Sequence, residues 1–387
     1  MYDEWTKEEL ISEIENLKRR KKYGLVWEAK DEDAVKELRD NYPYLEEDIS
    51  KQILTDNNKP TNLIIEGDNY HSLSVLNYTH REKIDVIYID PPYNTGARDW
   101  KYNNDYVDSE DSFRHSKWIN MMYERLKLAK NLLANEGVLI CTIDKYEQPR
   151  LILLLEEIFS DKEIHCISII HNQAGTQGKN FSYNNEFAIF VIPKNQATIK
   201  KTVRKDLLES TFRDWGPSSK RENAKNCFYP IIVKNNKIIG FGDVSKDNFS
   251  PDNSNIHMSD GTTHIYPIGK DGSERKWVFA RNSVEKIRDQ LFCRIDKDEI
   301  TIIRQKSEAS YKTVWDDKIF YANIHGSKLL NNIIDFKFPY PKSLYAVKEC
   351  INAVIHDKDN AVILDFFAGC TLKTIFLLVS SSSLFLI

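Results

Sequence analysis

Between residues 62 and 159, short apolar runs alternate with stretches of helical periodicity. The run from Ile84 to Ile89 is rich in β-branched residues, and residues 138–143 have the same texture, so both predict buried strands. Residues 113–133 lie between them and carry apolar side chains at helical spacing. Strand and helix alternating at this spacing predict an α/β fold built on a parallel sheet.

Three aspartates come directly after the predicted strands of this region. Asp68 lies in a Gly-Asp turn after the short run 62–65, Asp90 follows Ile89, and Asp144 follows Ile143. In parallel sheets, ligands bind at the edge where the carboxyl ends of the strands meet. We therefore expect these carboxylates near one ligand site.

The strand ending at Ile89 continues into Asp-Pro-Pro-Tyr, residues 90–93. Pro91 and Pro92 have a locked φ and no N–H, so they form a stiff turn with no donor beside the nearby carbonyl oxygens. Asp90 and a carbonyl can accept hydrogen bonds from an amino group, and Tyr93 offers a flat ring to a planar base, which must leave a duplex to reach it. The alternatives are a loop that binds a peptide module and a simple turn; the position directly after a buried strand argues against both.

The composition is that of an ordinary globular protein. The 387 residues carry a formal net charge of −4, with 41% hydrophobic and 29% charged residues, so the whole molecule is not a polycation. The six cysteines form no Cys-x-x-Cys pair, and no signal peptide or metal-ligand spacing is recognisable. We predict reduced thiols, a cytoplasmic protein and no metal. No apolar run reaches the ~20 residues that a membrane span needs.

The first 60 residues differ in composition from the rest of the chain. Residues 1–50 contain 9 Lys and Arg against 15 Asp and Glu, and Leu10, Ile14 and Leu17 fall on one helical face. We interpret this segment as a solvated helical lead-in that packs one apolar stripe. A dimerisation arm, and with it a homodimer, is the alternative.

A basic region stands out further along the chain. Residues 194–246 contain 12 Lys and Arg against 5 Asp and Glu, with aromatic residues such as Trp215 and Phe228 among them. A basic segment with interleaved aromatics in an acidic protein indicates contact with a polyanion. A solvated basic face is the alternative.

An ordered set of motifs extends from about residue 60 to 369. It comprises EGDN (Glu66–Asn69), DPPYNTG (Asp90–Gly96), Trp118–Asp144, Asn172–Lys194, Arg213–Ile231, FPYPK (Phe338–Lys342) and LDFFAG (Leu364–Gly369). This set resembles an amino-methylating DNA methyltransferase of the permuted class, in which the catalytic motif precedes the cofactor glycine motif. The similarity is greatest to the adenine-specific modification subunits of type III restriction–modification systems.

The resemblance implies a function and a cofactor. Asp90 and the Pro91 carbonyl would accept hydrogens from the N6 amine of an adenine flipped out of double-stranded DNA, and Tyr93 would stack on that base. The methyl donor would be S-adenosylmethionine, with no metal needed. A DPPY start favours adenine N6; cytosine N4 stays open as an alternative. A restriction subunit with helicase and endonuclease activity would be a partner.

The resemblance also implies binding residues. The residues expected at the cofactor are Asp68, Lys342, Asp365, Phe366 and Gly369. The region 196–320 occupies the place of the family's target-recognition domain, and the residues expected at DNA are Arg213, Lys220, Arg221 and Lys225.

The chain departs from the family pattern after Gly369. The family continues with Ser-Gly-Thr-Thr and a later strand that ends in an acidic residue, whereas this sequence continues CTLKTIFLLVSSSSLFLI. Thr371 stands where the second glycine would allow close backbone approach. We expect a truncated or frameshifted copy with no later strand; an adapted C-terminal strand and a membrane anchor are the alternatives.

The predicted fold is therefore a Rossmann-like S-adenosylmethionine-dependent methyltransferase sheet, incomplete at its C-terminal end, with an inserted DNA-recognition domain. The predicted segments are the N-terminal segment 1–60, the catalytic part 61–195, the insert 196–320, the return 321–369 and the tail 370–387. The predicted function is adenine-N6 methylation of DNA within a restriction–modification system. A catalytically inactive DNA-binding remnant is the alternative.

Overall fold

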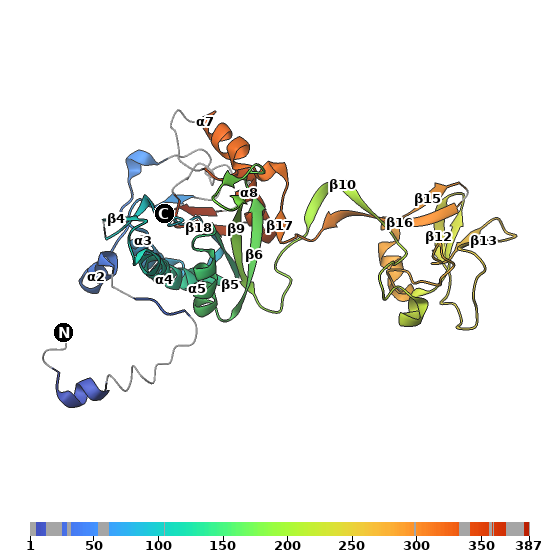
Figure 1. Cartoon of the computed structure of the whole chain (residues 1–387), viewed down its shortest axis with the longest axis horizontal. Helices are drawn as coiled ribbons and strands as arrows, with labels where there is room; N and C mark the ends of the chain where they lie inside the picture. The colour runs from blue at the N-terminus through green and yellow to red at the C-terminus, as the bar shows by residue number, and fades with distance from the viewer. Residues whose placement is uncertain are drawn as a thin grey trace. The chain divides into compact units, whose positions relative to one another are not determined.

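The computed structural model describes residues 5–12, 25–28, 32–52, 62–103, 105–297, 299–332, 341–355, 358, 360–368 and 383–386. The chain divides into two compact units (Figure 1). The larger comprises residues 1–200 and 311–387, and the smaller comprises residues 201–310. The smaller unit lies within the predicted insert 196–320.

The larger unit is built on an eight-stranded sheet in the order β1-β19-β18-β2-β5-β9-β6-β17. The strands are β1 (Leu63–Ile64), β2 (Ile84–Ile89), β5 (Leu133–Ile143), β6 (Lys162–Ile170), β9 (Asn185–Pro193), β17 (Val314–Trp315), β18 (Val362–Asp365) and β19 (Ser383–Leu386). β9 pairs antiparallel with β5 and β6, and the other neighbouring pairs are parallel. The predicted α/β fold with a parallel sheet is confirmed.

Helices cover both faces of this sheet. They are α3 (Asn69–Thr79), α4 (Arg114–Leu132), α5 (Gln148–Ile158) and α8 (Leu344–Ile355). Along β2, Ile87 and Ile89 pack with α3, α4 and α5 in one core cluster, whereas Val86 and Tyr88 pack with α8 in a second. Successive side chains of a strand point to opposite faces, so a strand covered on both faces must be apolar throughout. This explains why the run from Ile84 to Ile89 has no polar–apolar alternation over its last four residues.

Smaller elements complete this unit. They are α2 (Asp33–Asp40), η1 (Ile49–Lys51), the hairpins β3 (Ala97–Tyr102) with β4 (Asp105–Asp108) and β7 (Thr176–Gln177) with β8 (Ser182–Tyr183), η5 (Lys318–Phe320), the π-helix η6 (Asn323–Lys328) and α7 (Leu329–Asn331).

The tail differs from the prediction. We expected no strand after Gly369, yet β19 pairs in parallel with β18 on one side and β1 on the other. That prediction is wrong, and the alternative of an adapted strand describes residues 383–386. The hydrogen bonds between neighbouring strands use backbone groups. A segment whose side chains depart from the family pattern can therefore still pair with β18. Gly369 and residues 370–382 lie outside the described residues.

The structure describes one residue of the apolar stripe predicted for the N-terminal segment. Leu10 is exposed, and Ile14 and Leu17 lie outside the described residues. Leu25 and Trp27 pack against the core instead, and the ring centre of Trp27 lies 5.2 Å from that of Tyr123 on α4. Among the described residues of the segment, Leu25 and Trp27 therefore pack against the core.

The smaller unit has its own core. One sheet has the order β10-β16-β15 and the other β12-β11-β14-β13. The elements are β10 (Thr202–Thr211), η2 (Arg221–Asn223), η3 (Lys225–Cys227), β11 (Ile231–Lys234), β12 (Lys237–Phe241), β13 (Asn255–His257), β14 (Thr263–Ile265), α6 (Arg281–Val284), η4 (Glu285–Gln290), β15 (Leu291–Asp296) and β16 (Glu299–Ala309). Phe212, Tyr229 and Trp277 are fully or almost fully buried between them. A core of this kind marks the unit as a domain in its own right.

Two kinds of feature are absent from the described ranges. No helix there is long and apolar enough to cross a bilayer. Nor do three or more His, Cys, Asp or Glu side chains in those ranges gather where they could hold a metal ion.

Asp85 gives a test of the central strand pair. Its carboxylate accepts a hydrogen bond from the backbone N–H of Val362 at 2.8 Å and pairs with Lys358 at 2.6 Å. Asp85→Ala leaves the Val362 N–H without this acceptor, so we expect the free energy of unfolding to fall by about 1–3 kcal/mol. Lys358→Met removes an exposed partner and should cost less than about 1 kcal/mol. Urea unfolding of both variants measures the difference, and equal losses would contradict this role of Asp85.

Candidate active site

The parallel pairing brings three predicted carboxylates to one edge of the sheet. The strands β18, β2 and β5 are neighbours, and Asp365, Asp90 and Asp144 lie at or directly after their carboxyl ends. Asp68 follows β1 on the same side, because β1 also runs parallel to this group through β19. The edge is thus lined by acidic side chains.

The Asp-Pro-Pro-Tyr turn leaves two acceptors open. Asp90 Oδ1 accepts a hydrogen bond from Thr142 Oγ1 at 2.7 Å and lies 3.4 Å from Lys342 Nζ, while Oδ2 has no partner in the described part of the chain. The Pro92 carbonyl accepts from Trp118 Nε1 at 2.7 Å. The Pro91 carbonyl accepts no hydrogen bond from any described residue. A bound amine would therefore meet no competing donor at Asp90 Oδ2 or the Pro91 oxygen from the residues that the structure describes.

A buried cation lies beside this turn. Lys342 is 7% exposed; its ammonium donates to Glu186 on β9, and its Nζ lies 4.1 Å from the centre of the Tyr93 ring. The Tyr93 hydroxyl donates to the same Glu186 oxygen at 3.2 Å. Burial lowers the pKa of the Lys342 ammonium, and the Asp90 carboxylate opposes that shift. Lys342 covers one face of the Tyr93 ring, so a planar base would stack on the other face.

Glu186 was not predicted from the sequence. It is 8% exposed and stands in strand β9, directly before a run of seven apolar residues, 187–193. A lone carboxylate in such a strand needs a buried partner, which is a signal that could have been used.

The residues after Tyr93 hold the turn in place. Asn94 is buried with φ of 55°; its Nδ2 donates to Glu147 Oε1 at 2.5 Å, and its Oδ1 accepts from Trp100 Nε1 at 3.0 Å. Gly96 has φ of 84°, and a Cβ there would lie 2.9 Å from Ser109 Cα. The Asn-Thr-Gly after the motif therefore has a structural reason of its own.

Three of the residues predicted at the cofactor lie at the acidic edge of the sheet, near the ends of β1 and β18, and one lies elsewhere. Asp68 caps α3 by accepting from the Tyr70 N–H at 2.8 Å, and Asp365 is 5% exposed and accepts from the Phe367 N–H at 2.9 Å. The Phe366 ring is fully buried in the core, while its carbonyl accepts from Asn69 Nδ2 at 2.8 Å. Lys342 instead lies against the Asp-Pro-Pro-Tyr turn. Gly369 and Phe338 lie outside the described residues.

One residue predicted at DNA serves the fold of the smaller unit. Arg221 is 8% exposed, donates to the carbonyls of Phe249 and Lys246 at 2.7 Å each, and pairs with Glu274 at 2.9 Å. Its guanidinium joins loops inside the unit, so the expectation that it faces DNA does not agree with the structure. Basic character in the sequence did not distinguish it from exposed cations.

The other basic residues of this group are more accessible. The side chains of Lys220 and Lys225 are 68% and 60% exposed, although Lys225 pairs with Asp247 at 2.6 Å. Arg213 donates to the Ile268 carbonyl, and its guanidinium lies 4.3 Å from the ring centre of Trp215, which is 50% exposed. Lys220, Lys225 and Trp215 are thus available on the surface of the unit.

Asp144 gives a pH test of the acidic edge. Burial raises its pKa from 3.8 to about 6, while the Tyr146 N–H, which donates to it at 2.8 Å, acts in the opposite direction. The folded state then binds more protons than the unfolded state between about pH 4 and 6, so the Asp144 contribution to stability falls across that window and is level above it.

In Asp144→Asn this contribution is absent, and the amide oxygen can still accept from the Tyr146 N–H. We expect the free energy of unfolding of the variant, relative to that of the unaltered chain, to rise by about 1–3 kcal/mol between pH 4 and pH 6. Between pH 6 and pH 8 this difference should not change further. Urea unfolding at each pH measures the gain. A difference that is constant with pH would contradict the raised pKa.

Comparison with known proteins agrees with these features. The DNA methylase family model matches residues 84–374. The type II methyltransferase M.KpnI of Klebsiella pneumoniae is 28% identical, over 78% of this chain and 73% of its own length. The Mod subunit of the type III restriction–modification enzyme EcoPI of Escherichia phage P1 is 26% identical, over 92% of this chain and 61% of its own. The StyLTI Mod subunit of Salmonella typhimurium is 25% identical, over 83% of this chain and 50% of its own.

The chain thus spans only about half to two thirds of the length of these Mod subunits. The family match nevertheless covers most of the chain, and it includes the Asp-Pro-Pro-Tyr turn, Lys342 and Asp365. This chain belongs to the DNA methylase family.

Proposed function

We propose that the chain transfers the methyl group of S-adenosylmethionine to N6 of an adenine flipped out of double-stranded DNA. The observation that carries this proposal is the pair of open acceptors, Asp90 Oδ2 and the Pro91 carbonyl, on a rigid turn beside the half-buried Tyr93 ring. An exocyclic amine has two N–H donors, and an adenine presents a flat ring next to them.

The turn would act by orientation. When both N–H groups of the amine are held in the plane of the acceptors, its lone pair is aimed out of that plane at the methyl group. Positioning of this kind can supply a large part of a rate enhancement, because little proton movement must precede the transfer. Asp90 would also stabilise the positive charge that develops on the nitrogen. Glu186 and Lys342 would hold the side chains of Asp90 and Tyr93 in their positions.

The acidic edge fits the proposed cofactor. S-adenosylmethionine supplies a methyl group activated by a positively charged sulfonium, and it also carries an ammonium and two ribose hydroxyls. Carboxylates suit such groups, and Asp68, with a 42% exposed side chain, and the largely buried Asp365 are the ones predicted for it. Gly369, which the resemblance also assigns to the cofactor, lies outside the described residues, and its role stays a prediction.

We further propose that the chain serves as the modification subunit of a type III restriction–modification system in the cytoplasm. The similarity to Mod subunits supports this. Its partners would be DNA, bound through the smaller unit, and a restriction subunit. A homodimer is part of the same proposal.

Asp90→Asn tests the catalytic role. The amide replaces an acceptor by a donor, so we expect methyl transfer to fall by roughly 10²–10³-fold, while duplex binding stays within about twofold. Transfer of a labelled methyl group from S-adenosylmethionine to unmethylated DNA measures the rate, and nucleoside analysis of the product separates N6-methyladenine from N4-methylcytosine. The exposed Asp105→Asn is the matched control.

Equal loss of transfer and DNA binding would make Asp90 a structural residue. If the unaltered, folded chain bound DNA but gave neither cofactor binding nor methyl transfer, the inactive remnant would be the correct description.

The salt dependence of DNA affinity tests whether the smaller unit contacts the phosphates of DNA. Replacing Lys220 and Lys225 together by Gln removes two exposed cations, and we expect the slope of log K against log salt to become shallower by up to about 2. Arg221→Gln should instead lower the thermal stability of the unit, because it breaks the internal contacts. An unchanged slope in the double variant would remove both lysines from the phosphate contacts.

A further inference from the structure

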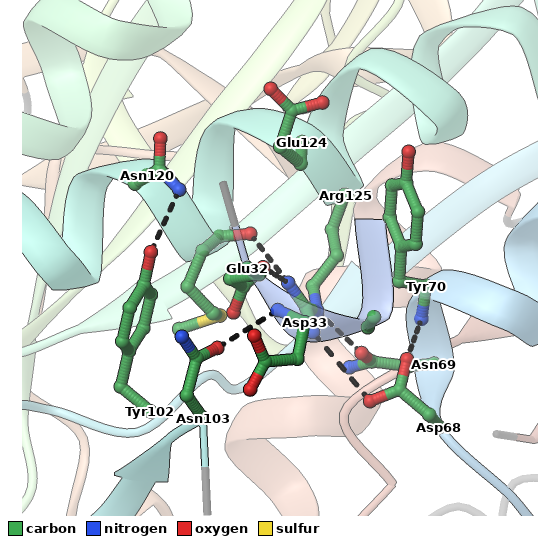
Figure 2. Close-up of polar contacts among 12 residues, drawn as sticks. Glu32, Asp33, Asp68, Asn69, Tyr70, Tyr102, Asn103, Asn120, Glu124 and Arg125 are labelled. Carbon is green, nitrogen blue, oxygen red and sulfur yellow. Dashed lines mark hydrogen bonds and ion pairs between the residues drawn. The ribbon is translucent and has the colours of Figure 1, made fainter. Parts of the chain in front are cut away.

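A buried ion pair joins the N-terminal segment to the catalytic fold. Glu32, which precedes α2, and Arg125 of α4 are each 5% exposed, and Arg125 Nη1 lies 2.6 Å from Glu32 Oε2 (Figure 2). Burial raises the pKa of Glu32, and the Arg125 charge opposes that shift. Arg125 lies within the Trp118–Asp144 motif, but neither the resemblance nor the Asp-Pro-Pro-Tyr chemistry assigns a role to Arg125 or to Glu32.

Arg125 distributes its donors over three segments. Nη1 donates to Glu32 and to the Met121 carbonyl at 3.0 Å, Nε donates to Asn69 Oδ1 at 2.5 Å, and Nη2 lies 3.7 Å from Asp68 Oδ2. Figure 2 shows the guanidinium between Glu32 on one side and the Asp68–Asn69 turn on the other. A planar guanidinium has a fixed donor geometry, so the direction of Nη1 toward Glu32 also determines where Nε and Nη2 point.

Asn69 carries the link on to the cofactor loop. Its oxygen accepts from Arg125, which leaves its amide group to donate, and Nδ2 donates to the Phe366 carbonyl at 2.8 Å. Phe366 directly follows Asp365 at the end of β18. A continuous chain of contacts thus connects Glu32, Arg125, Asn69 and the backbone of the loop that opens at Phe366.

The N-terminal segment has further contacts that hold Glu32 in place. The Asp33 N–H donates to Asn103 Oδ1 at 3.0 Å, and His71 Nε2 lies 3.1 Å from the Ala34 carbonyl. Trp27 packs on Tyr123, which neighbours Arg125 on α4. These contacts come from α3, α4 and the β3–β4 hairpin, so residues 25–28 and 32–34 are seated on the same side of the fold as the Asp68 turn.

We propose that Glu32 and Arg125 are positioning residues for S-adenosylmethionine. Through this pair, the N-terminal segment would hold the Asp68–Asn69 turn and the Phe366 backbone in the positions that bind the cofactor. The inference rests on the proposed function. It gives the segment a role different from both a solvated lead-in and a dimerisation arm. Asp68 and the Phe366 backbone would keep their positions only while Arg125 is held by Glu32.

The test removes the pair without leaving a buried charge. The double variant Glu32→Leu/Arg125→Met replaces both ions by apolar side chains of similar volume, a change that folded proteins tolerate. Asn69→Asp is the second variant: it keeps a partner for Arg125 but places a carboxylate against the Phe366 carbonyl. Glu37→Gln is the control, because Glu37 lies on α2 near Glu32, has a 62% exposed side chain and pairs with His71 of α3 at 3.5 Å.

Calorimetric titration with S-adenosylmethionine measures the dissociation constant of each folded chain. We expect it to rise at least tenfold in the double variant and in Asn69→Asp, and to stay within twofold in Glu37→Gln. Methyl transfer at saturating cofactor should remain near that of the unaltered chain, so that KM rises while kcat does not. A merely structural role would lower thermal stability without this split.

Unchanged affinity in both folded variants would overturn the inference and leave the proposed function standing. Failure of the unaltered chain to bind S-adenosylmethionine would overturn the cofactor assignment, and the inference with it.

Discussion

The parallel alignment of β18, β2 and β5 is the constraint on which the rest of the site depends. Each of these strands ends in or is followed by an aspartate, so a common strand direction is enough to gather Asp365, Asp90 and Asp144 at one edge. Helices on both faces bury the strands that lead to this edge. A carboxylate directly after a buried strand has its direction fixed by that strand and not by a long loop. The proposed reaction depends on the orientation of the amine and therefore needs such a fixed carboxylate.

Buried charges then tie distant segments to this edge. Lys342 comes from the return segment after the smaller unit, and its ammonium joins Glu186 of β9 to the turn at Asp90. Arg125 comes from α4 and joins Glu32 to the turn at Asp68. Each cation would be costly to bury alone, and each has carboxylate partners from two different parts of the chain. The two clusters support different halves of the proposed site, one for the base and one for the cofactor.

The smaller unit illustrates a limit of reading charge from sequence. Arg221, Lys220 and Lys225 are close together in a basic stretch, yet the first is enclosed by backbone carbonyls and the others lie on the surface. Composition predicts that a segment is basic, but it does not say which cations are used in internal contacts. The same holds for the tail: its side-chain pattern did not predict a strand, whereas the open ladder of β18 accepts backbone of almost any sequence.

The sequence by itself determined the strand–helix alternation, the stiff Asp-Pro-Pro-Tyr turn and the set of motifs, because periodicity, proline geometry and motif order are local properties of the chain. It therefore predicted the fold class, and it named Asp90, Pro91 and Tyr93 as site residues. Only the tertiary structure decided that the Pro92 carbonyl of the turn accepts from Trp118, that Lys342 lies over the Tyr93 ring and contacts Glu186, and that Glu32 reaches Arg125 across 93 residues of sequence. Those contacts join residues that are far apart in the chain. They form because buried polar groups need partners, and only the packed molecule determines which groups are buried.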